Sequence, residues 1–210
     1  MKNKIKDLII SPHADDEVLG CGGILNKNSY VYYCGLDESL VLKDNKHRIG
    51  LNKKFQEIKD VEKYLGFSWD WNENTKVNYY KEEDLIKVFE DLINKLKPER
   101  IFIPYPSYNQ DHRAVYRAAL IALRPHDKNF FVKKILVYEQ PHILIWEQKL
   151  FKSNYFIPVK IKRKLVAYSL YKSQVRGMRS AEVIKAIAKL NGAKSNCEYA
   201  EGFIIERWVE

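Results

Sequence analysis

Short apolar segments alternate with amphipathic helical segments through the first 125 residues of this sequence. The apolar segments are residues 8–10, 30–35 and 100–103. Between them, apolar residues recur at three- and four-residue steps in 45–65 and 82–97, which is typical of helices with one buried face. This alternation predicts crossover helices between parallel strands. The expected fold class is therefore α/β: a Rossmann-like, mostly parallel open sheet with helices on both faces.

Further predicted elements continue this pattern, and none of them indicates a domain boundary. The same signals predict strands at 77–80, 132–139 and 155–160, and helices at about 112–123, 163–174 and 181–190. The 210 residues are 46% hydrophobic, which is enough for one sizeable core, and they contain no repeat or obvious linker. We therefore expect a single domain over residues 1–210.

The charge and cysteine content restrict the partners and the compartment. The 36 Lys and Arg residues exceed the 27 Asp and Glu residues by nine, which would suit an anionic partner such as nucleic acid, phospholipid or a phosphorylated glycan. The cations are scattered, with one dense run at 160–164, so a solvated basic surface without a nucleic-acid partner is the better interpretation. Three cysteines without CxxC spacing indicate a reduced, cytoplasmic setting. No apolar run approaches the roughly 18 residues of a membrane span. The sequence does not indicate an oligomeric state, so a homo-oligomer stays possible.

Two polar loops follow predicted strands. The first, at 11–17, contains His13, Asp15 and Asp16, and the second, at 109–113, contains His112. Loops at the carboxyl ends of parallel strands meet at one edge of the sheet, where ligands bind. Imidazole and carboxylate groups are suitable ligands for Zn²⁺, and other divalent transition metals such as Fe²⁺, Co²⁺ or Ni²⁺ accept the same ligands. The sequence therefore predicts a metal site at this edge.

The adjacent aspartates allow a division of roles. Neighbouring side chains on a turn point in different directions, so one carboxylate can bind the metal while the other accepts a proton from water. Zinc lowers the pKa of a bound water from about 15.7 to about 7 and polarises a carbonyl group. This combination predicts hydrolysis of an amide bond.

The two loops also resemble the motifs of a known family. Residues 11–23 read Ser-Pro-His-Ala-Asp-Asp-Glu-Val-Leu-Gly-Cys-Gly-Gly, and residues 109–112 read Asn-Gln-Asp-His. They are similar to the His-Pro-Asp-Asp-Glu and His-x-Asp-His motifs of the PIG-L/LmbE-type zinc N-deacetylases, which hydrolyse the acetamide of N-acetylglucosaminyl conjugates. Weaker similarities at 54–66, 172–174 and 199–203 extend the resemblance over nearly the whole chain.

The resemblance implies a function and a set of roles. It implies that this chain removes the acetyl group from a small N-acetylglucosamine-type amino sugar conjugate. It implies one zinc ion per chain, held by His13, Asp16 and His112, with Asp15 as the general base.

Two positions depart from the family pattern. Asn109 stands where the family has a histidine that stabilises the oxyanion as an imidazolium; an amide can donate a hydrogen bond but carries no charge, and loss of such a donor costs on the order of 10²–10³ in rate. We expect Asn109 to serve this role weakly. His47, His126 or His142 could replace it, although an ordinary surface histidine is the simpler interpretation of each. Lys54 replaces a substrate-binding arginine, exchanging a bidentate fork for a point charge.

Three further residues near the motifs are candidates. Asp111 is expected to take part in catalysis by orienting Asn109 or His112, or else to cap the following helix. Arg113 could bind an anionic group of the substrate or be a solvated cation. Glu17 could orient a ligand or the loop backbone from behind the site, or only add charge to a helix N-terminus.

Two other functions stay open. One is hydrolysis of a different amide on the same scaffold, as by a deformylase or an amidase. The other is a non-catalytic zinc-binding or glycan-binding module. Asp15 argues against the second, because a pure binding module needs no base beside its metal.

Overall fold

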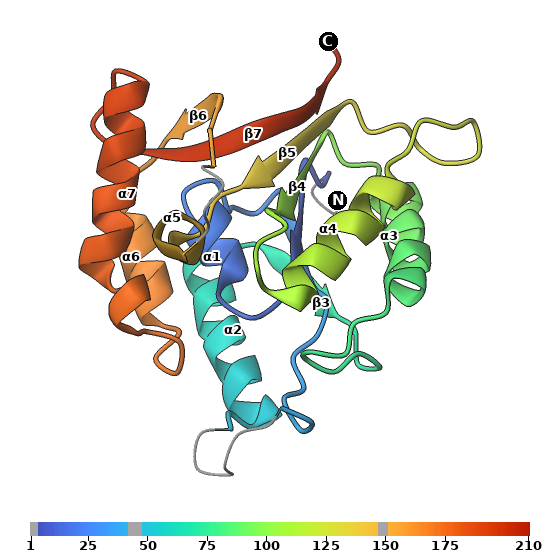
Figure 1. Ribbon diagram of the computed structural model, residues 1–210, viewed down its shortest axis with the longest axis horizontal. Helices are drawn as coiled ribbons and strands as arrows, with labels where there is room; N and C mark the ends of the chain where they lie inside the picture. The colour runs from blue at the N-terminus through green and yellow to red at the C-terminus, as the bar shows by residue number, and fades with distance from the viewer. Residues whose placement is uncertain (1–3, 42–47, 147–150) are drawn as a thin grey trace.

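The computed structural model describes residues 4–41, 48–146 and 151–210, and its centre is one mixed β-sheet (Figure 1). The strand order is β3-β2-β1-β4-β5-β7-β6. Strands β3, β2, β1, β4 and β5 are parallel, and β7 pairs antiparallel with both β5 and β6. The strand bounds are β1 Asp7–Ser11, β2 Ser29–Tyr33, β3 Ser68–Trp71, β4 Arg100–Pro104, β5 Lys134–Tyr138, β6 Tyr155–Pro158 and β7 Ala200–Trp208.

Helices cover both faces of this sheet (Figure 1). Their bounds are α1 Asp16–Cys21, α2 Leu51–Leu65, α3 Glu82–Leu96, α4 Gln110–Ala122, α5 Pro141–Trp146, α6 Ile161–Ser169 and α7 Ala181–Lys194, with a short 3-10 helix η2 at Gly177–Arg179. Apolar residues of α1, α2, α6 and α7 form one core, and those of α3, α4 and α5 form the other. The predicted fold class is confirmed.

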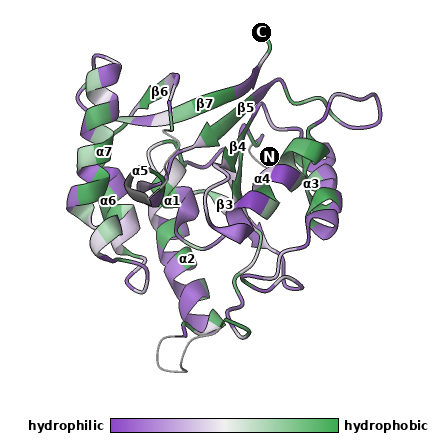
Figure 2. Cartoon of the chain, viewed as in Figure 1, coloured by the Kyte–Doolittle hydropathy of each residue, from purple (hydrophilic) through white to green (hydrophobic). Residues whose placement is uncertain are grey.

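Strand β1 shows why its sequence is a continuous apolar run. Ile9 belongs to the core on one face of the sheet, whereas Leu8 and Ile10 belong to the core on the other. Successive side chains of a strand point to opposite faces, and a central parallel strand buries both. Helices α2 and α3 differ, because each buries one side only, and Figure 2 shows hydrophilic residues along their outer surfaces.

Parts of the sequence prediction are wrong in detail. The edge strand beyond β2 is Ser68–Trp71, and residues 77–80 form a loop instead of the predicted strand. Asn78 has a φ of 72°, a left-handed conformation that a strand does not accommodate. The helix predicted at 163–174 occupies Ile161–Ser169, so residues 170–176 are free to approach the sheet edge. The sequence did not predict α5 or β7.

The topology places several loops at one edge of the sheet. Strand β1 pairs with β2 on one side and with β4 on the other. The chain therefore adds β2 and β3 on one side of β1 and then returns to add β4 and β5 on the other, so the strand order reverses between β1 and β4. Ligands of open α/β sheets bind beyond the carboxyl ends of the strands at such a reversal. In the described residues, no helix is both long enough and apolar enough to cross a membrane.

Candidate active site

The loop after β1 has an unusual backbone conformation. Asp15, the residue before α1, has a φ of 96° in the left-handed region. This conformation costs free energy in a residue other than glycine and persists only where the surroundings impose it. Here the backbone N–H of Asp15 donates to Glu17 Oε2 at 3.1 Å, and Glu17 Oε1 accepts from the Tyr171 hydroxyl at 2.6 Å. The fully buried Glu17 therefore contacts the loop backbone, and burial raises its pKa to about 8 although Tyr171 opposes this.

Three predicted ligands come together at the edge between β1 and β4. His13 Nδ1 lies 3.2 Å from Asp16 Oδ2, and His112 Nε2 lies 3.3 Å from the same oxygen. One ligand atom from each residue lies within 4.8 Å of the other two. Two imidazole nitrogens and one carboxylate oxygen, with no fourth protein ligand in the group among the described residues, fit the donor set of a catalytic zinc site.

The electrostatics of this cluster agree with a site for a cation. Burial disfavours a charged imidazole, but the hydrogen bonds that His13 donates to the Asp111 and Asp16 carboxylates outweigh it and raise the pKa of His13 to about 9. Burial likewise disfavours the Asp16 carboxylate, yet His112 and His13 hold the pKa of Asp16 well below its usual range. The Asp16 carboxylate is thus ionised at the centre of the group, where it can bind a cation.

Each end of the cluster has a further hydrogen bond that fixes its orientation. Asp111 Oδ2 lies 2.9 Å from His13 Nε2 and accepts the backbone N–H of Asn78 at 2.8 Å. Gln140, directly after β5, donates from Nε2 to Asp16 Oδ1 at 2.6 Å. Partners of this kind orient metal ligands. No sequence motif pointed to Gln140, because its contact with Asp16 depends on the pairing of β5 with β4.

In the structure, Asp111 contacts a candidate metal ligand, and Asn109 takes the helix-capping role that was considered for Asp111. Asp111 contacts His13 and not Asn109 or His112 through its side chain, so its predicted partners are wrong. Its alternative role as a helix cap is also wrong, because α4 begins at Gln110 and the Asn109 side chain accepts the backbone N–H of Asp111 at 2.8 Å. A side-chain oxygen at this position is a normal N-cap.

Asp15 forms an ion pair with a residue from a distant part of the chain. Its Oδ2 lies 2.6 Å from Nη1 of Arg179 in η2, and its side chain is buried. Burial raises the pKa of Asp15 to about 7, although the Arg179 guanidinium opposes the shift. The carboxylate next to Asp16 is therefore held by a fixed cation. Nothing in the sequence motifs identified Arg179.

The cluster opens into a pocket of about 560 Å³. One wall is formed by the loops after β1 and β4, with His13, Asp15 and Asp16 from the first and Asn109 and His112 from the second. A second wall is formed by residues 174 and 176–179, and further lining residues include Glu38, Val41, Lys54, Val77 and Asn78. This volume is in the range of pockets that bind small molecules.

His142 also lines this pocket, so the surface interpretation of this histidine is wrong. Its ring centroid lies 5.3 Å from that of His112 at an interplanar angle of 83°, and its Nε2 lies 3.2 Å from Ser107 Oγ. Burial, aided by the charge of His112, lowers the pKa of His142 to about 4. His126 instead contacts Lys128 and Asn129 outside the pocket, and His47 lies outside the described residues.

The two predicted substrate-binding cations differ in position. Lys54 lines the pocket, but its Nζ is buried and lies 2.8 Å from both the Leu36 carbonyl and Glu38 Oε1. Arg113 is absent from the pocket lining and donates to the backbone carbonyls of Ser107 and Tyr108. The structure therefore places Lys54 at the site with its charge already engaged, and Arg113 behind the loop.

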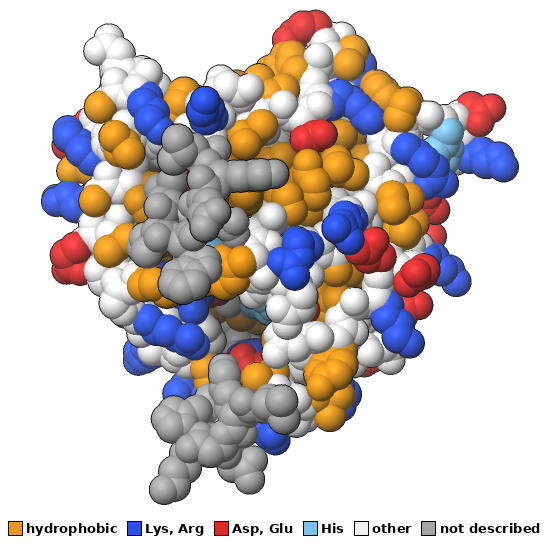
Figure 3. All heavy atoms as spheres, in the orientation of Figure 1, with side chains coloured by type: hydrophobic (Ala, Val, Ile, Leu, Met, Phe, Trp, Pro, Cys, Tyr) orange, Lys and Arg blue, Asp and Glu red, His pale blue; other side chains and the backbone are white. Residues whose placement is uncertain are grey.

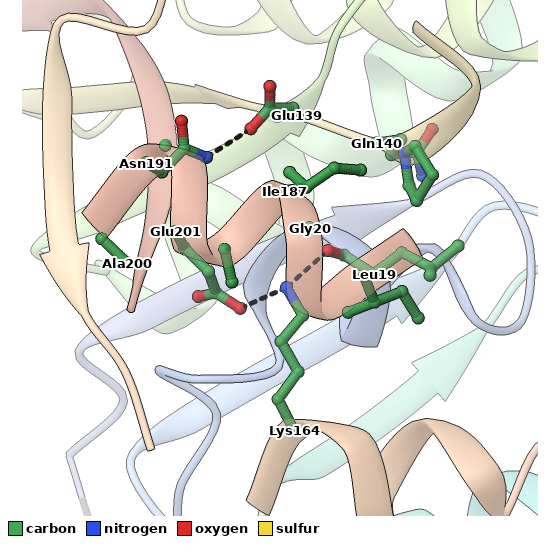
Figure 4. Close-up of a pocket in the computed structure, with 13 residues that line it drawn as sticks. Leu19, Gly20, Glu139, Gln140, Lys164, Ile187, Asn191, Ala200 and Glu201 are labelled. Carbon is green, nitrogen blue, oxygen red and sulfur yellow. Dashed lines mark hydrogen bonds and ion pairs between the residues drawn. The ribbon is translucent and has the colours of Figure 1, made fainter. Parts of the chain in front are cut away.

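A second cavity, drawn in Figure 4, is separate from the pocket of the candidate site. Residues around it contact α1, which follows the loop with His13. Lys164 reaches up from α6 and donates at 2.7 Å both to the Leu19 carbonyl near the end of α1 and to Glu201 Oε1. Glu201 also accepts the Gly23 backbone N–H at 2.8 Å. The cavity has about 20 Å³, which is room for roughly one water molecule. These contacts hold α1 in place.

Together these features define a Rossmann-like α/β protein with a candidate metal centre and an adjacent carboxylate at its switch point. Residues 8–123, more than half of the chain, match the family described as PIG-L: GlcNAc-PI de-N-acetylase. The chain belongs to this family of deacetylases, as its motifs predicted. No curated protein matches the chain.

Solved structures share the fold at low sequence identity. The conserved protein TT1542 from Thermus thermophilus is 21% identical, with a TM-score of 0.75 and coverage of 98% of this chain and 96% of that one. N,N'-diacetylchitobiose deacetylase from Pyrococcus horikoshii is 22% identical (TM-score 0.72, coverage 96% and 84%). GalB, a 4-carboxy-2-hydroxymuconate hydratase from Pseudomonas putida KT2440, is 20% identical (TM-score 0.76, coverage 98% and 99%). The fold is therefore shared by proteins described as deacetylases and by a hydratase.

Proposed function

We propose that this protein is a zinc-dependent N-deacetylase that removes the acetyl group from an N-acetylglucosamine-type sugar conjugate. One observation carries the proposal. The ligand atoms of His13, Asp16 and His112 lie within 4.8 Å of one another, and Asp15, next in sequence to Asp16, lines the same pocket. Membership of the PIG-L family supports the choice of an acetamide as the bond that breaks.

The residues of the chain divide the chemistry between them. A metal ion held by His13, Asp16 and His112 would polarise the acetamide carbonyl and activate water. Asp15 accepts a proton from the attacking water and returns it to the departing amine nitrogen. Asn109 and His142 each offer a neutral hydrogen bond to the acetamide oxygen from the pocket wall.

The ligand and domain assignments follow from the same geometry. We infer one zinc ion per chain, with another divalent transition metal as the alternative occupant, because imidazole and carboxylate groups bind several such metals. We also infer that residues 1–210 act as one domain, since the pocket takes residues from the loop after β1 and from η2 near the far end of the chain.

Acetate release from a panel of N-acetylglucosamine conjugates tests the proposal. The zinc-loaded protein should release acetate, and both chelation and Asp15→Asn should abolish release. Asp15→Asn keeps the size of the side chain, so a measured metal content of one per chain would show that the variant retains its site. A protein that binds one metal and releases no acetate from any conjugate would favour the binding-module alternative, and formate or another acid in place of acetate would favour a different amide.

A further inference from the structure

A chain of hydrogen bonds between fully buried side chains ends at the backbone of Asp15. The Tyr171 hydroxyl donates to Glu17 Oε1 at 2.6 Å, and the hydroxyl oxygens of Tyr171 and Tyr33 lie 3.1 Å apart. Glu17 Oε2 accepts the backbone N–H of Asp15 at 3.1 Å. Each hydroxyl has one proton to donate, so Tyr33 donates to Tyr171, and Tyr171 donates to Glu17. Glu17 therefore accepts a hydrogen bond at each of its two carboxylate oxygens.

The members of this chain come from separate parts of the fold. Tyr33 is the last residue of β2, Glu17 lies in α1, and Tyr171 follows α6, so the two side-chain contacts span 138 and 154 residues. Packing does not account for the two hydroxyls, because phenylalanine rings would fill the same core positions, and buried polar groups cost free energy unless they are paired. At the surface, by contrast, Lys and Arg side chains on the face seen in Figure 3 are interspersed with acidic and apolar ones. The buried hydrogen bonds therefore connect β2 and the segment after α6 to the loop that carries Asp15.

The backbone conformation of Asp15 depends on a contact of this kind. Its φ of 96° lies in the left-handed region, which a residue with a side chain adopts only where its surroundings impose it. The φ of a residue also sets the direction in which its side chain leaves the backbone. The Asp15 carboxylate lines the pocket, 2.6 Å from Arg179 Nη1. The hydrogen bond from the Asp15 N–H to Glu17 therefore helps to set where this carboxylate points.

The neighbouring candidate ligand, Asp16, is held by different contacts. Its Oδ2 accepts the backbone N–H of His13 at 3.0 Å, and its Oδ1 accepts Nε2 of Gln140 at 2.6 Å. Neither contact involves Glu17 or Tyr171. A change in the buried hydrogen bonds should therefore displace Asp15 while the group of candidate ligands keeps its geometry.

We propose that Tyr171 is a positioning residue for Asp15. Its hydroxyl orients the Glu17 carboxylate, which in turn holds the Asp15 backbone in the left-handed conformation that directs the Asp15 carboxylate into the pocket. Tyr171 touches neither the substrate nor the candidate metal ligands and acts only through Glu17. This inference rests on the proposed deacetylase function, in which Asp15 is the general base.

Tyr171→Phe, which removes one hydroxyl and keeps the ring, tests this role. In the zinc-loaded protein kcat should fall about tenfold or more, while KM and metal content stay as in the wild type. Hydrogen exchange of the Asp15 backbone amide, followed by NMR, should become about tenfold faster or more, because its acceptor is no longer oriented. Tyr138→Phe is the matched control, since Tyr138 is also fully buried and its hydroxyl donates to the Ile10 carbonyl at 2.9 Å. This control should lose comparable stability to urea but keep the wild-type kcat and the wild-type exchange rate at Asp15.

A second variant tests whether Tyr171 acts through Glu17. In Glu17→Leu, whose side chain accepts no hydrogen bond, adding Tyr171→Phe should change kcat by less than about twofold, because the two residues form one unit. The full loss in this background, an unchanged kcat or Asp15 exchange rate in Tyr171→Phe alone, or an equal loss of kcat in Tyr138→Phe would each overturn the positioning role. A wild-type protein that releases no acetate would contradict the proposed function instead. The exchange rate of the Asp15 amide in Tyr171→Phe and Tyr138→Phe would then still decide whether Tyr171 positions Asp15.

Discussion

The two walls of the pocket are built in different ways. The wall from the loops after β1 and β4 carries His13, Asp16 and His112, and it directly follows two paired parallel strands. The second wall carries Arg176 and Arg179 and is attached through side-chain hydrogen bonds to α2 and α6. The first wall is therefore fixed by the sheet, and the second by contacts that can change without moving a strand.

This difference suggests that the walls have separate tasks. The sheet edge holds the candidate metal ligands, which must keep a fixed geometry, and the second wall supplies the Arg179 cation that holds the Asp15 carboxylate. A metal site requires its ligands within a few tenths of an ångström, which rigid elements provide better than loops. Variants in the two walls should accordingly affect different measured quantities.

The largest expected effect is on the first wall. His112→Ala removes one of three candidate ligands, so metal content should fall from one per chain to near zero. Acetate release should fall by about a thousandfold or more, because the charge stabilisation that a metal supplies is worth several kcal/mol. Elemental analysis and an acetate assay measure the two quantities. His126→Ala is the matched control, and a His112→Ala protein that keeps its metal would show that the cluster is not the binding site.

The next effect concerns the support beneath the first wall. Lys164→Met leaves the Glu201 carboxylate buried without its ion-pair partner, so the free energy of unfolding should fall by about 3–5 kcal/mol. Urea unfolding measures this change. The neighbouring Lys162 is the control, and Lys162→Met should stay within about 0.5 kcal/mol, as is usual for surface changes. A similar loss in both variants would mean that α1 does not depend on the buried pair.

The sequence predicted the first wall well because its signals are local. The apolar run at 8–10 ends directly at the loop with His13 and Asp16, and the run at 100–103 ends shortly before His112. Once both runs are assigned to parallel strands, the convergence of their loops follows from the topology. The fold class was predictable for the same reason.

The second wall and the positions of Gln140, Asn78 and His142 could not be predicted, because they depend on contacts between distant parts of the chain or on local structure without a clear sequence signal. Arg179 meets Asp15 across 164 residues, and Gln140 meets Asp16 across 124. The strand predicted at 77–80 does not form, because Asn78 adopts a left-handed conformation and donates its backbone N–H to Asp111 Oδ2. His142 resembled a surface histidine because α5, which carries it, has no clear pattern in the sequence.

A smaller effect is expected for Arg179. Arg179→Gln removes the cation that holds Asp15, so kcat should fall by about 10- to 100-fold, the usual effect of losing a group that orients a catalytic residue. KM and metal content should change little, because Arg179 contacts none of the three candidate ligands. Arg179→Lys should recover part of kcat. Steady-state kinetics and elemental analysis check these values, and loss of metal in Arg179→Gln would show that the two walls are not independent.

The smallest effect is expected at Asn109, which lines the pocket and also caps α4. Asn109→His restores the imidazole of the family motif, but it removes the hydrogen bond that caps α4, at a cost of about 1 kcal/mol in the free energy of unfolding. Loss of an oxyanion donor outright costs about 10²–10³ in rate, whereas here His142 already places a neutral imidazole in the pocket. The gain in kcat should therefore stay below about tenfold. Asn109→Ser, which keeps the cap without an imidazole, separates the two contributions, and a gain above about a hundredfold in Asn109→His would mean that His142 contributes nothing to the oxyanion.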